Sequence, residues 1–176
     1  MTLSTSTIDI PTPDGAADAF VAYPDDGQPQ PGVLYYMDAF GLRKQVFDMC
    51  ERLAEAGYFV VAPNVFYRDG RAPLFDDLPD LMKPENRERL FTALGPFREH
   101  LTPDAAMRDA GAYLDFLAGH DAVSDGPVGL TGYCMAAGSP CAPRAPSQTG
   151  WPRRPASTAA TWRPIPPPAR TCWRPR

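Results

Sequence analysis

The stretch Pro127–Ala136, with the sequence PVGLTGYCMA, constrains the fold of this chain more than any other part of it. A short apolar run bounded by Pro and Gly is typical of a buried parallel strand. Residues Gly132–Ala136 then have the spacing of a nucleophile elbow in which Cys replaces Ser. Small residues two positions before and after Cys134 allow such a strained turn to pack. The stretch therefore predicts a strand followed by a tight turn that raises a thiol above the sheet.

A simpler interpretation of Cys134 stays open. A Cys that follows a buried strand is more often a small core residue than a nucleophile, and the chain would then be another α/β fold with a structural Cys. The two hypotheses differ in thiol reactivity, because an inert core thiol resists alkylation at neutral pH.

The length of 176 residues suits one domain, although it is short for a complete α/β enzyme. The N-terminus lacks the build of a signal peptide and no apolar run reaches membrane-spanning length, so we expect a cytoplasmic protein without a membrane partner. Cysteines occur at positions 50, 134, 141 and 172, with no Cys-x-x-Cys pair and no clustered His. We therefore expect neither disulfides nor a bound metal.

The first third of the chain predicts a hairpin and then a buried strand. Residues 7–10 and 19–23 are β-prone runs on either side of Pro13–Gly15, whose turn chemistry favours an antiparallel hairpin. Gly32–Met37 is apolar without alternation, which is typical of a strand inside a parallel sheet. This strand ends at Asp38.

A strand–helix–strand unit follows from the next residues. The stretch Arg43–Ala56 has apolar residues at helical spacing, and Gly57 is a suitable C-terminal cap. Tyr58–Ala62 is apolar and β-branched, so it predicts a second strand joined to the first by a right-handed crossover.

Four prolines interrupt residues 64–101, which therefore have room only for short helices, one of them over 84–94. This segment is either a wall or lid of a pocket or a surface excursion without function. Thr102–Asp104 is a good helix start, and we expect that helix to run to Ala118 with one apolar face. The alternation of strands and helices predicts an α/β fold with an open, mostly parallel sheet.

Three motifs in this order resemble the dienelactone hydrolases, which are α/β-hydrolase enzymes with a cysteine nucleophile. The motifs are Gly32–Leu42, Gly57–Pro63 and Val128–Met135, and the resemblance covers about residues 8 to 135. It implies that residues 1–135 are the N-terminal portion of an α/β-hydrolase domain, with a mostly parallel sheet and an N-terminal hairpin. It implies no cofactor.

The resemblance also implies roles for single residues. Cys134 would be the nucleophile that forms an acyl-enzyme with an ester or lactone carbonyl. Asp38 stands where the family usually has a Glu that interacts with the resting thiol; as an alternative, it is a turn residue that caps the next helix. The backbone N–H groups of Ala39 and Met135 would form the oxyanion hole.

Residues 136–176 have a different composition from the rest of the chain. They contain ten Pro and seven Arg but no acidic residue, and the formal charge is −11 up to Met135 and +7 beyond it. A segment of this composition cannot form a packed core, so we expect a disordered Pro/Arg-rich tail. Because the change falls within the elbow motif, where the family has Gly-Gly instead of Ala136–Ala137, we interpret the tail as the product of a frameshift.

The expected function follows from these features. The intact enzyme would hydrolyse a small ester or lactone, whereas this chain is expected to be inactive, because no Asp, Glu or His follows Cys134. We also expect poor solubility and aggregation, because the strand before Cys134 would be left at the edge of the sheet without its covering helix. His100 and His120 precede the nucleophile and are expected to be solvent-facing or helix-terminal residues. The alternative is a non-enzymatic remnant whose basic tail binds nucleic acid or a protein partner, although we expect nucleic acid not to be a partner.

Overall fold

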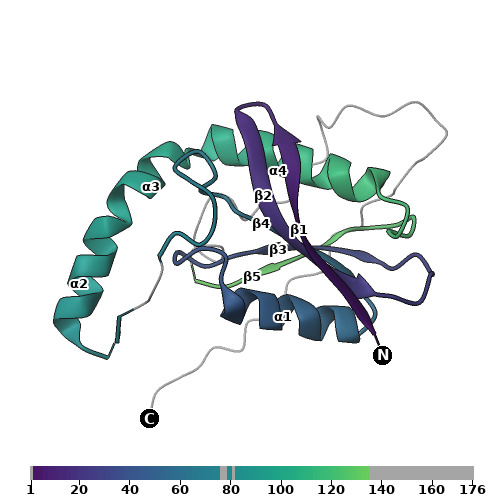
Figure 1. Cartoon of the computed structure of the whole chain (residues 1–176). Helices are drawn as coiled ribbons and strands as arrows, with labels where there is room; N and C mark the ends of the chain where they lie inside the picture. Colours follow the sequence, from purple (N-terminus) through teal and green to yellow (C-terminus); the bar gives the residue numbers. More distant parts are fainter. Residues whose placement is uncertain (1, 76–78, 81, 135–176) are drawn as a thin grey trace, which may run out of the picture.

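The computed structural model describes residues 2–75, 79–80 and 82–134 of the chain. These residues form a five-stranded sheet in the order β1-β2-β4-β3-β5, with helices on both faces (Figure 1). The strands are β1 Leu3–Thr12, β2 Gly15–Pro24, β3 Gly32–Tyr36, β4 Phe59–Pro63 and β5 Gly129–Gly132. The helices are α1 Lys44–Glu55, α2 Pro84–Ala93, α3 Gly95–His100 and α4 Pro103–Gly119.

Strands β1 and β2 form the predicted hairpin. They pair antiparallel from Leu3 with Pro24 to Thr12 with Gly15, so the turn falls at Pro13 and Asp14, as expected. Both strands are longer than their β-prone cores, because each residue of one finds a partner on the other. Strand β2 also pairs antiparallel with β4, which joins the hairpin to the rest of the sheet.

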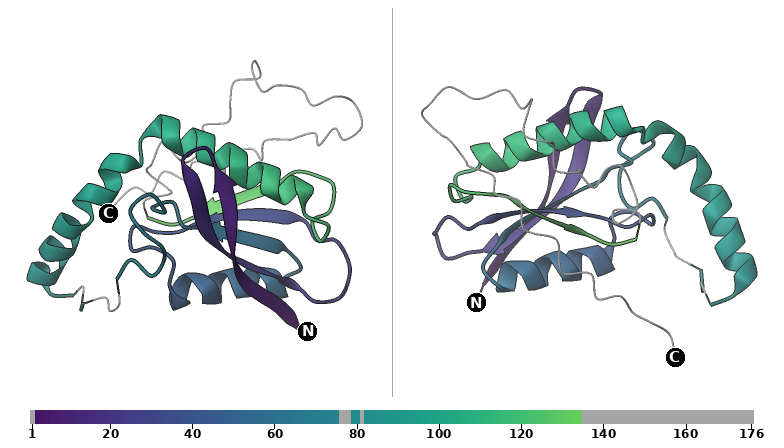
Figure 2. Two further views of the ribbon diagram at one scale, coloured as in Figure 1. Left: turned by 45° about the horizontal axis from the view of Figure 1, so that its top comes forward. Right: turned by 180° about the vertical axis from the view of Figure 1, so that it is seen from behind.

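The centre of the sheet consists of β3 and β4, whose residues are all buried. They run parallel, with Val33 opposite Val60 and Leu34 opposite Val61. Strand β5 is parallel to β3, so the predicted parallel sheet holds for β4, β3 and β5, and the hairpin supplies the antiparallel part. Two views show α1 on one face and α4 on the other, which explains why the central strands need apolar residues on both sides (Figure 2).

Helix α1 has the predicted apolar face and the predicted end. Its buried residues Val46, Cys50 and Ala54 recur at helical spacing. Gly57 follows with φ +92°, a left-handed conformation that favours glycine, and its N–H donates to the carbonyl of Ala54 at 2.9 Å. The chain thereby turns directly into β4.

Helix α4 begins where the sequence predicts. The Thr102 side chain accepts a hydrogen bond from the N–H of Ala105 at 3.2 Å and caps the helix. The predicted apolar face is correct for the buried residues Ala106, Ala110 and Leu117, but Asp109 and Tyr113 are buried on the same helix. The apolar pattern alone did not predict these two.

Asp109 is buried in an ion pair with Arg68, which compensates its charge. The guanidinium of Arg68 donates to both oxygens of Asp109, at 2.8 and 2.9 Å, and to Asp14 at 2.6 Å. The hydroxyl of Tyr67 donates to Asp109 at 3.0 Å. The hairpin turn, the segment after β4 and α4 are thus held together by one ionic cluster.

Helices α2 and α3 extend beside the sheet as an arm (Figure 1). Helix α2 covers almost the span expected from the sequence and starts at Pro84, a residue that is favourable in the first helical turn. Its residue Leu90 and the following Leu94 are buried against Ala39, and these three form a second, smaller apolar cluster.

Strand β5 is not the buried strand that its apolar run predicted, although it has the edge position that we expected for a sheet without the later strands. Among the described residues it pairs with β3 alone, so it lies at the edge of the sheet, and Leu130 is 39% exposed. An apolar run bounded by Pro and Gly indicates a strand but not its place in the sheet. The exposed edge agrees with the expected aggregation hazard.

The predicted tail, residues 136–176, and Met135 lie outside the described residues. Within the described part of the chain, no helix is long and apolar enough to cross a membrane. In the same part, no group of three or more His, Cys, Asp or Glu side chains is arranged to hold a metal ion.

Candidate active site

Cys134 has the backbone conformation that an elbow requires. It lies two residues after the end of β5, it is exposed, and its φ is +57°. No other non-glycine residue in the described part of the chain has a positive φ. Such a conformation costs an L-residue roughly 1–2 kcal/mol, and strain of this kind is concentrated at functional positions.

The register of two strands brings Asp38 and Cys134 to the same end of the sheet, where the strands have their carboxyl ends. Strands β3 and β5 are adjacent and parallel, and Tyr36 is opposite Gly132. Asp38 and Cys134 each lie two residues beyond this pair, where the carboxyl ends of the strands meet. In open parallel sheets, ligands bind at this end.

The Asp38 carboxylate is already engaged by its own loop. Arg43 donates to Oδ1 at 2.7 Å and to Oδ2 at 2.8 Å, and the N–H of Phe40 donates to Oδ1 at 2.9 Å. An ionised carboxylate has about four acceptor positions. Donors from the described residues occupy three of them, two on Oδ1 and one on Oδ2, so among these residues Oδ2 keeps one position for a further donor such as a thiol.

Asp38 therefore has the geometry of a turn residue, as its alternative interpretation expects. It does not cap α1, because the N-cap residue of that helix is Arg43 and no side chain caps it. The structure places Asp38 beside the elbow but shows its carboxylate bound to Arg43.

Ala39, the expected oxyanion donor, is 8% exposed and packs with Leu90 and Leu94. It lies inside a turn in which the N–H of Gly41 donates to the carbonyl of Asp38 at 3.3 Å. Within the described residues, no acceptor is found for the N–H of Ala39. The other expected donor, Met135, lies outside those residues.

Aromatic side chains lie next to the elbow. Tyr133 is 57% exposed, and its ring centroid is 6.3 Å from that of Tyr35 on β3. The hydroxyl of Tyr35 donates to Sδ of Met49 at 3.0 Å. Burial is the main cause that raises the pKa of Tyr35 to about 12. Tyr35 is therefore a neutral structural residue at physiological pH.

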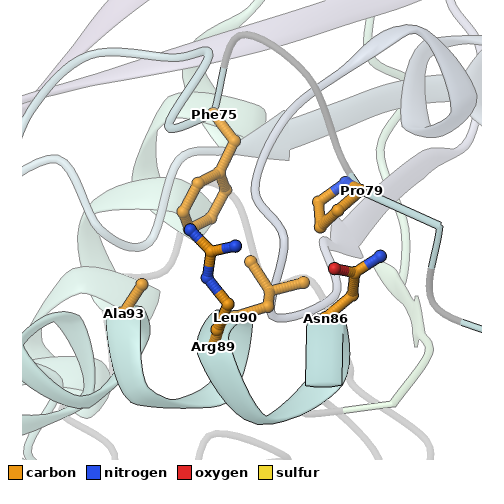
Figure 3. A pocket seen from close by; sticks show the side chains of 6 residues that line it. All are labelled: Phe75, Pro79, Asn86, Arg89, Leu90 and Ala93. Atoms are coloured by element: carbon orange, nitrogen blue, oxygen red, sulfur yellow. The ribbon is translucent and has the colours of Figure 1, made fainter. Parts of the chain in front are cut away.

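A cavity of about 280 Å³ lies between α2 and the segment before it, and Figure 3 shows the side chains around it. The cavity is lined by Phe75, Pro79, Asn86, Arg89, Leu90 and Ala93. Leu90 also packs against Ala39, so the cavity and the turn that carries Ala39 share this residue. All six lining residues belong to the segment 64–101, and the role of this segment as a wall of the substrate pocket stays a prediction.

Arg89 is the cationic group of this cavity. No carboxylate within salt-bridge distance of Arg89 is found in the described part of the chain. Arg89 was not among the residues expected at the site, although the sequence places an Arg four residues after Glu85 on an expected helix. Arg43, which lies five positions after its partner Asp38, was not expected there either.

Both histidines are helix-terminal, as expected. His100 ends α3, is 59% exposed, and its Nδ1 lies 2.5 Å from Oδ1 of Asp69. His120 follows α4, its ring packs against Phe59, and its Nδ1 accepts the N–H of Ala122 at 3.1 Å. The turn of His120 lies beside Gln30, just before β3 begins, whereas Cys134 follows the other ends of the strands. The structure does not bring His120 to the elbow.

The chain matches the model of the dienelactone hydrolase family over residues 17–145. The resemblance read from the sequence ends at Met135, whereas this match continues for ten more residues. A protein of Methylorubrum extorquens with the name "Putative carboxymethylenebutenolidase" is 29% identical over 128 residues, which are 72% of this chain and 40% of that protein. A protein of Escherichia coli K12 with the same name is 34% identical over 92 residues, 44% of this chain and 34% of that protein.

Solved structures show the same fold. A crystal structure described as a "Putative Dienelactone Hydrolase" from Klebsiella pneumoniae superposes with a TM-score of 0.59 at 22% identity. The superposition covers 77% of this chain and 51% of that one. The α/β-hydrolase fold expected from the sequence is therefore confirmed, and the chain spans about half the length of this structure and less than half of its relatives.

Proposed function

Because the chain belongs to the dienelactone hydrolase family, we propose that Cys134 is the nucleophile of a hydrolase that acts on ester or lactone bonds. The observation that carries the proposal is the φ of +57° at an exposed Cys two residues after the end of β5. A structural Cys has no need of a strained backbone or of exposure. According to this proposal, residues 1–135 are the part of the hydrolase domain that carries the nucleophile.

The proposed reaction starts with attack of the Cys134 thiolate on the substrate carbonyl. A C–S bond forms, and the carbonyl π electrons move to oxygen, where the N–H groups of Ala39 and Met135 stabilise the oxyanion. When the carbonyl re-forms, the ester C–O bond breaks, and the leaving alkoxide takes a proton from solvent water to become the alcohol. From a lactone, the same step opens the ring and leaves the hydroxyl on the acyl group. Asp38, through the remaining position on Oδ2, is proposed to hold the resting thiol.

The substrate is proposed to carry a carboxylate. The name of the M. extorquens relative denotes action on a butenolide, which is a lactone, with a carboxymethylene group. The cavity of this chain combines the apolar side chains of Phe75 and Leu90 with the guanidinium of Arg89, which has no carboxylate partner in the described residues. A guanidinium beside an apolar wall suits a small apolar acid, because it pairs with a carboxylate bidentately.

Hydrolysis of the acyl-enzyme needs a base to activate water. In this fold the base and its acidic partner follow the nucleophile in the chain, but no Asp, Glu or His follows Cys134 in this sequence. We therefore propose that this chain is acylated and does not turn over.

The test is acylation by an activated ester, followed by intact-protein mass spectrometry and by the release of nitrophenol. We expect one acyl group per chain on Cys134, none in Cys134→Ala, and no change in the matched control Cys50→Ala. Absence of acylation at Cys134 would contradict the nucleophile. Continued turnover that is lost in Cys134→Ala would contradict the proposed inactivity but support the nucleophile.

The carboxylate is tested separately. An activated ester with a free carboxylate and its methyl-capped analogue are compared in the wild type, in Arg89→Met and in Arg87→Met, an exposed residue of the same helix that does not line the cavity. We expect Arg89→Met to remove the preference for the acidic ester and Arg87→Met to retain it. Equal preference in all three proteins would contradict the role of Arg89.

A further inference from the structure

We propose that Arg43 is a positioning residue for the oxyanion hole, which it serves by fixing the turn that carries Ala39. The inference rests on the proposed roles of Cys134 and Ala39 and adds a residue that the sequence analysis did not consider.

Arg43 contacts the residues on both sides of Ala39. Its Nη1 donates to Oδ1 of Asp38 at 2.7 Å and to the carbonyl of Gly41 at 3.1 Å, and its Nη2 donates to Oδ2 of Asp38 at 2.8 Å. The guanidinium carbon lies over the ring of Phe40, 5.4 Å from its centroid. One planar group therefore binds a side chain, a backbone carbonyl and a ring of the same turn.

The other side of the turn has little freedom to adjust. Gly41 has φ +84°, and a Cβ at this position would lie 2.9 Å from Cδ1 of Leu74. Ala39 itself is packed against Leu90 and Leu94. The turn is thus confined by packing outside and by Arg43 inside. An oxyanion donor needs such confinement, because it must lie about 2.7–3.1 Å from the place where the negative charge develops.

Arg43 also compensates a charge that would oppose the reaction. Asp38 lies at the same end of the sheet as Cys134, and an unpaired carboxylate there would disfavour both a thiolate and an oxyanion. The Asp38 and Arg43 side chains are 20% and 19% exposed, so water screens their pairing less than it screens a surface pair. Lys keeps the positive charge of Arg43 but cannot donate two parallel hydrogen bonds. Arg43→Lys should therefore retain a function that depends on charge and lose one that depends on the position of the turn.

The experiment compares two reactions of Cys134 in the full chain. Acylation by an activated ester needs the thiolate and the oxyanion hole, whereas alkylation by iodoacetamide needs the thiolate alone. Their ratio cancels any change in thiolate content. We expect Arg43→Met to lower the ratio by about 100-fold, the size expected for a misplaced group, and Arg43→Lys to lower it nearly as far. The control is Lys44→Met, which removes an adjacent, exposed ion pair with Asp48 and should leave the ratio unchanged.

Hydrogen exchange supplies a measurement that does not depend on catalysis. The N–H groups of Phe40 and Gly41 donate within the turn, so we expect Arg43→Met to accelerate their exchange at least 10-fold, with α1 and β3 protected as in the wild type. An unchanged exchange rate at both amides would overturn the proposal, whether or not Cys134 is acylated. An unchanged ratio in Arg43→Met would overturn it too, whereas failure of the wild type to acylate would count against the proposed nucleophile alone.

Discussion

The guanidinium of Arg68 donates two hydrogen bonds to the carboxylate of Asp109, a residue of α4 whose side chain is only 3% exposed. The pair joins residues 41 positions apart in the sequence. It closes the segment after β4 onto the helix that covers one face of the sheet.

Replacement of Asp109 by Ala leaves Arg68 with its charge in a mostly buried place and with Asp14 as its remaining acidic partner. Removal of one member of a buried pair costs about 3–5 kcal/mol. We expect Asp109→Ala to lower the free energy of unfolding by this amount in urea titrations followed by circular dichroism. The matched control is Asp9→Ala, which removes the exposed ion pair with Arg71 and should change the stability very little. Equal stability of the two variants would contradict the structural role of the cluster.

The left-handed conformation of Cys134 predicts an unusual order of stabilities. Gly adopts this conformation without strain, which is worth about 1–2 kcal/mol, but it loses about 0.4–1 kcal/mol through the entropy of the unfolded chain. We therefore expect Cys134→Gly to be more stable than Cys134→Ala by about 0.5–1 kcal/mol. Chemical denaturation of both variants measures the difference, and a more stable Ala variant would argue against the positive φ.

Cys50 predicts how stability depends on alkaline pH. Burial, with a smaller effect of Glu51, raises the pKa of its thiol from 9.0 to about 12. The folded state thus keeps the thiol neutral while the unfolded chain ionises it, so this contribution is complete below pH 9 and is lost as the pH rises from 9 towards 12. We expect the loss to be smaller in Cys50→Ala, in urea titrations across that range. A parallel pH dependence in the two proteins would contradict the burial of the thiol.

Loss of the N-terminal cap of α4 should lower the stability less than loss of Asp109 does. In Thr102→Ala the N–H of Ala105 loses its side-chain acceptor, and we expect a loss of about 1 kcal/mol in the free energy of unfolding. Thr92→Ala is the control, because the Thr92 hydroxyl donates to the carbonyl of Glu88 within a helix and caps nothing. A cost in Thr92→Ala as large as in Thr102→Ala would show that the cap is not the source of the effect.

Local sequence patterns were sufficient for most elements of the fold. The hairpin turn at Pro13 and Asp14, the buried strand from Gly32, the cap at Thr102 and the stop at Gly57 all depend on residues close together in the chain. In each of them, the backbone conformation follows from a side chain, or from its absence, within a few positions.

Features that depend on distant residues were not predictable in the same way. The buried Asn64 donates to Oδ1 of Asp18 at 3.0 Å, across 46 positions. The burial of Asp109 depends on Arg68, which lies 41 positions earlier in the chain. No period or spacing encodes such pairings, because they arise only when the sheet brings the segments together.

The candidate site shows the same division. The motif around Cys134 predicted an exposed thiol, and the structure has one there. The partners of Asp38 were not predicted, because the chain offers several cations near it and only the turn selects Arg43. The role of Met135 stays a prediction.

The edge place of β5 has a consequence for motion. Within the described residues this strand is four residues long and hydrogen-bonded to β3 alone, whereas β3 and β4 are bonded on both sides. A strand held on one side opens at a lower free energy than the centre of its sheet. The thiol therefore follows a segment that opens more readily than the centre of the sheet, so we expect the geometry of the elbow to be lost in local openings that leave β3 and β4 paired.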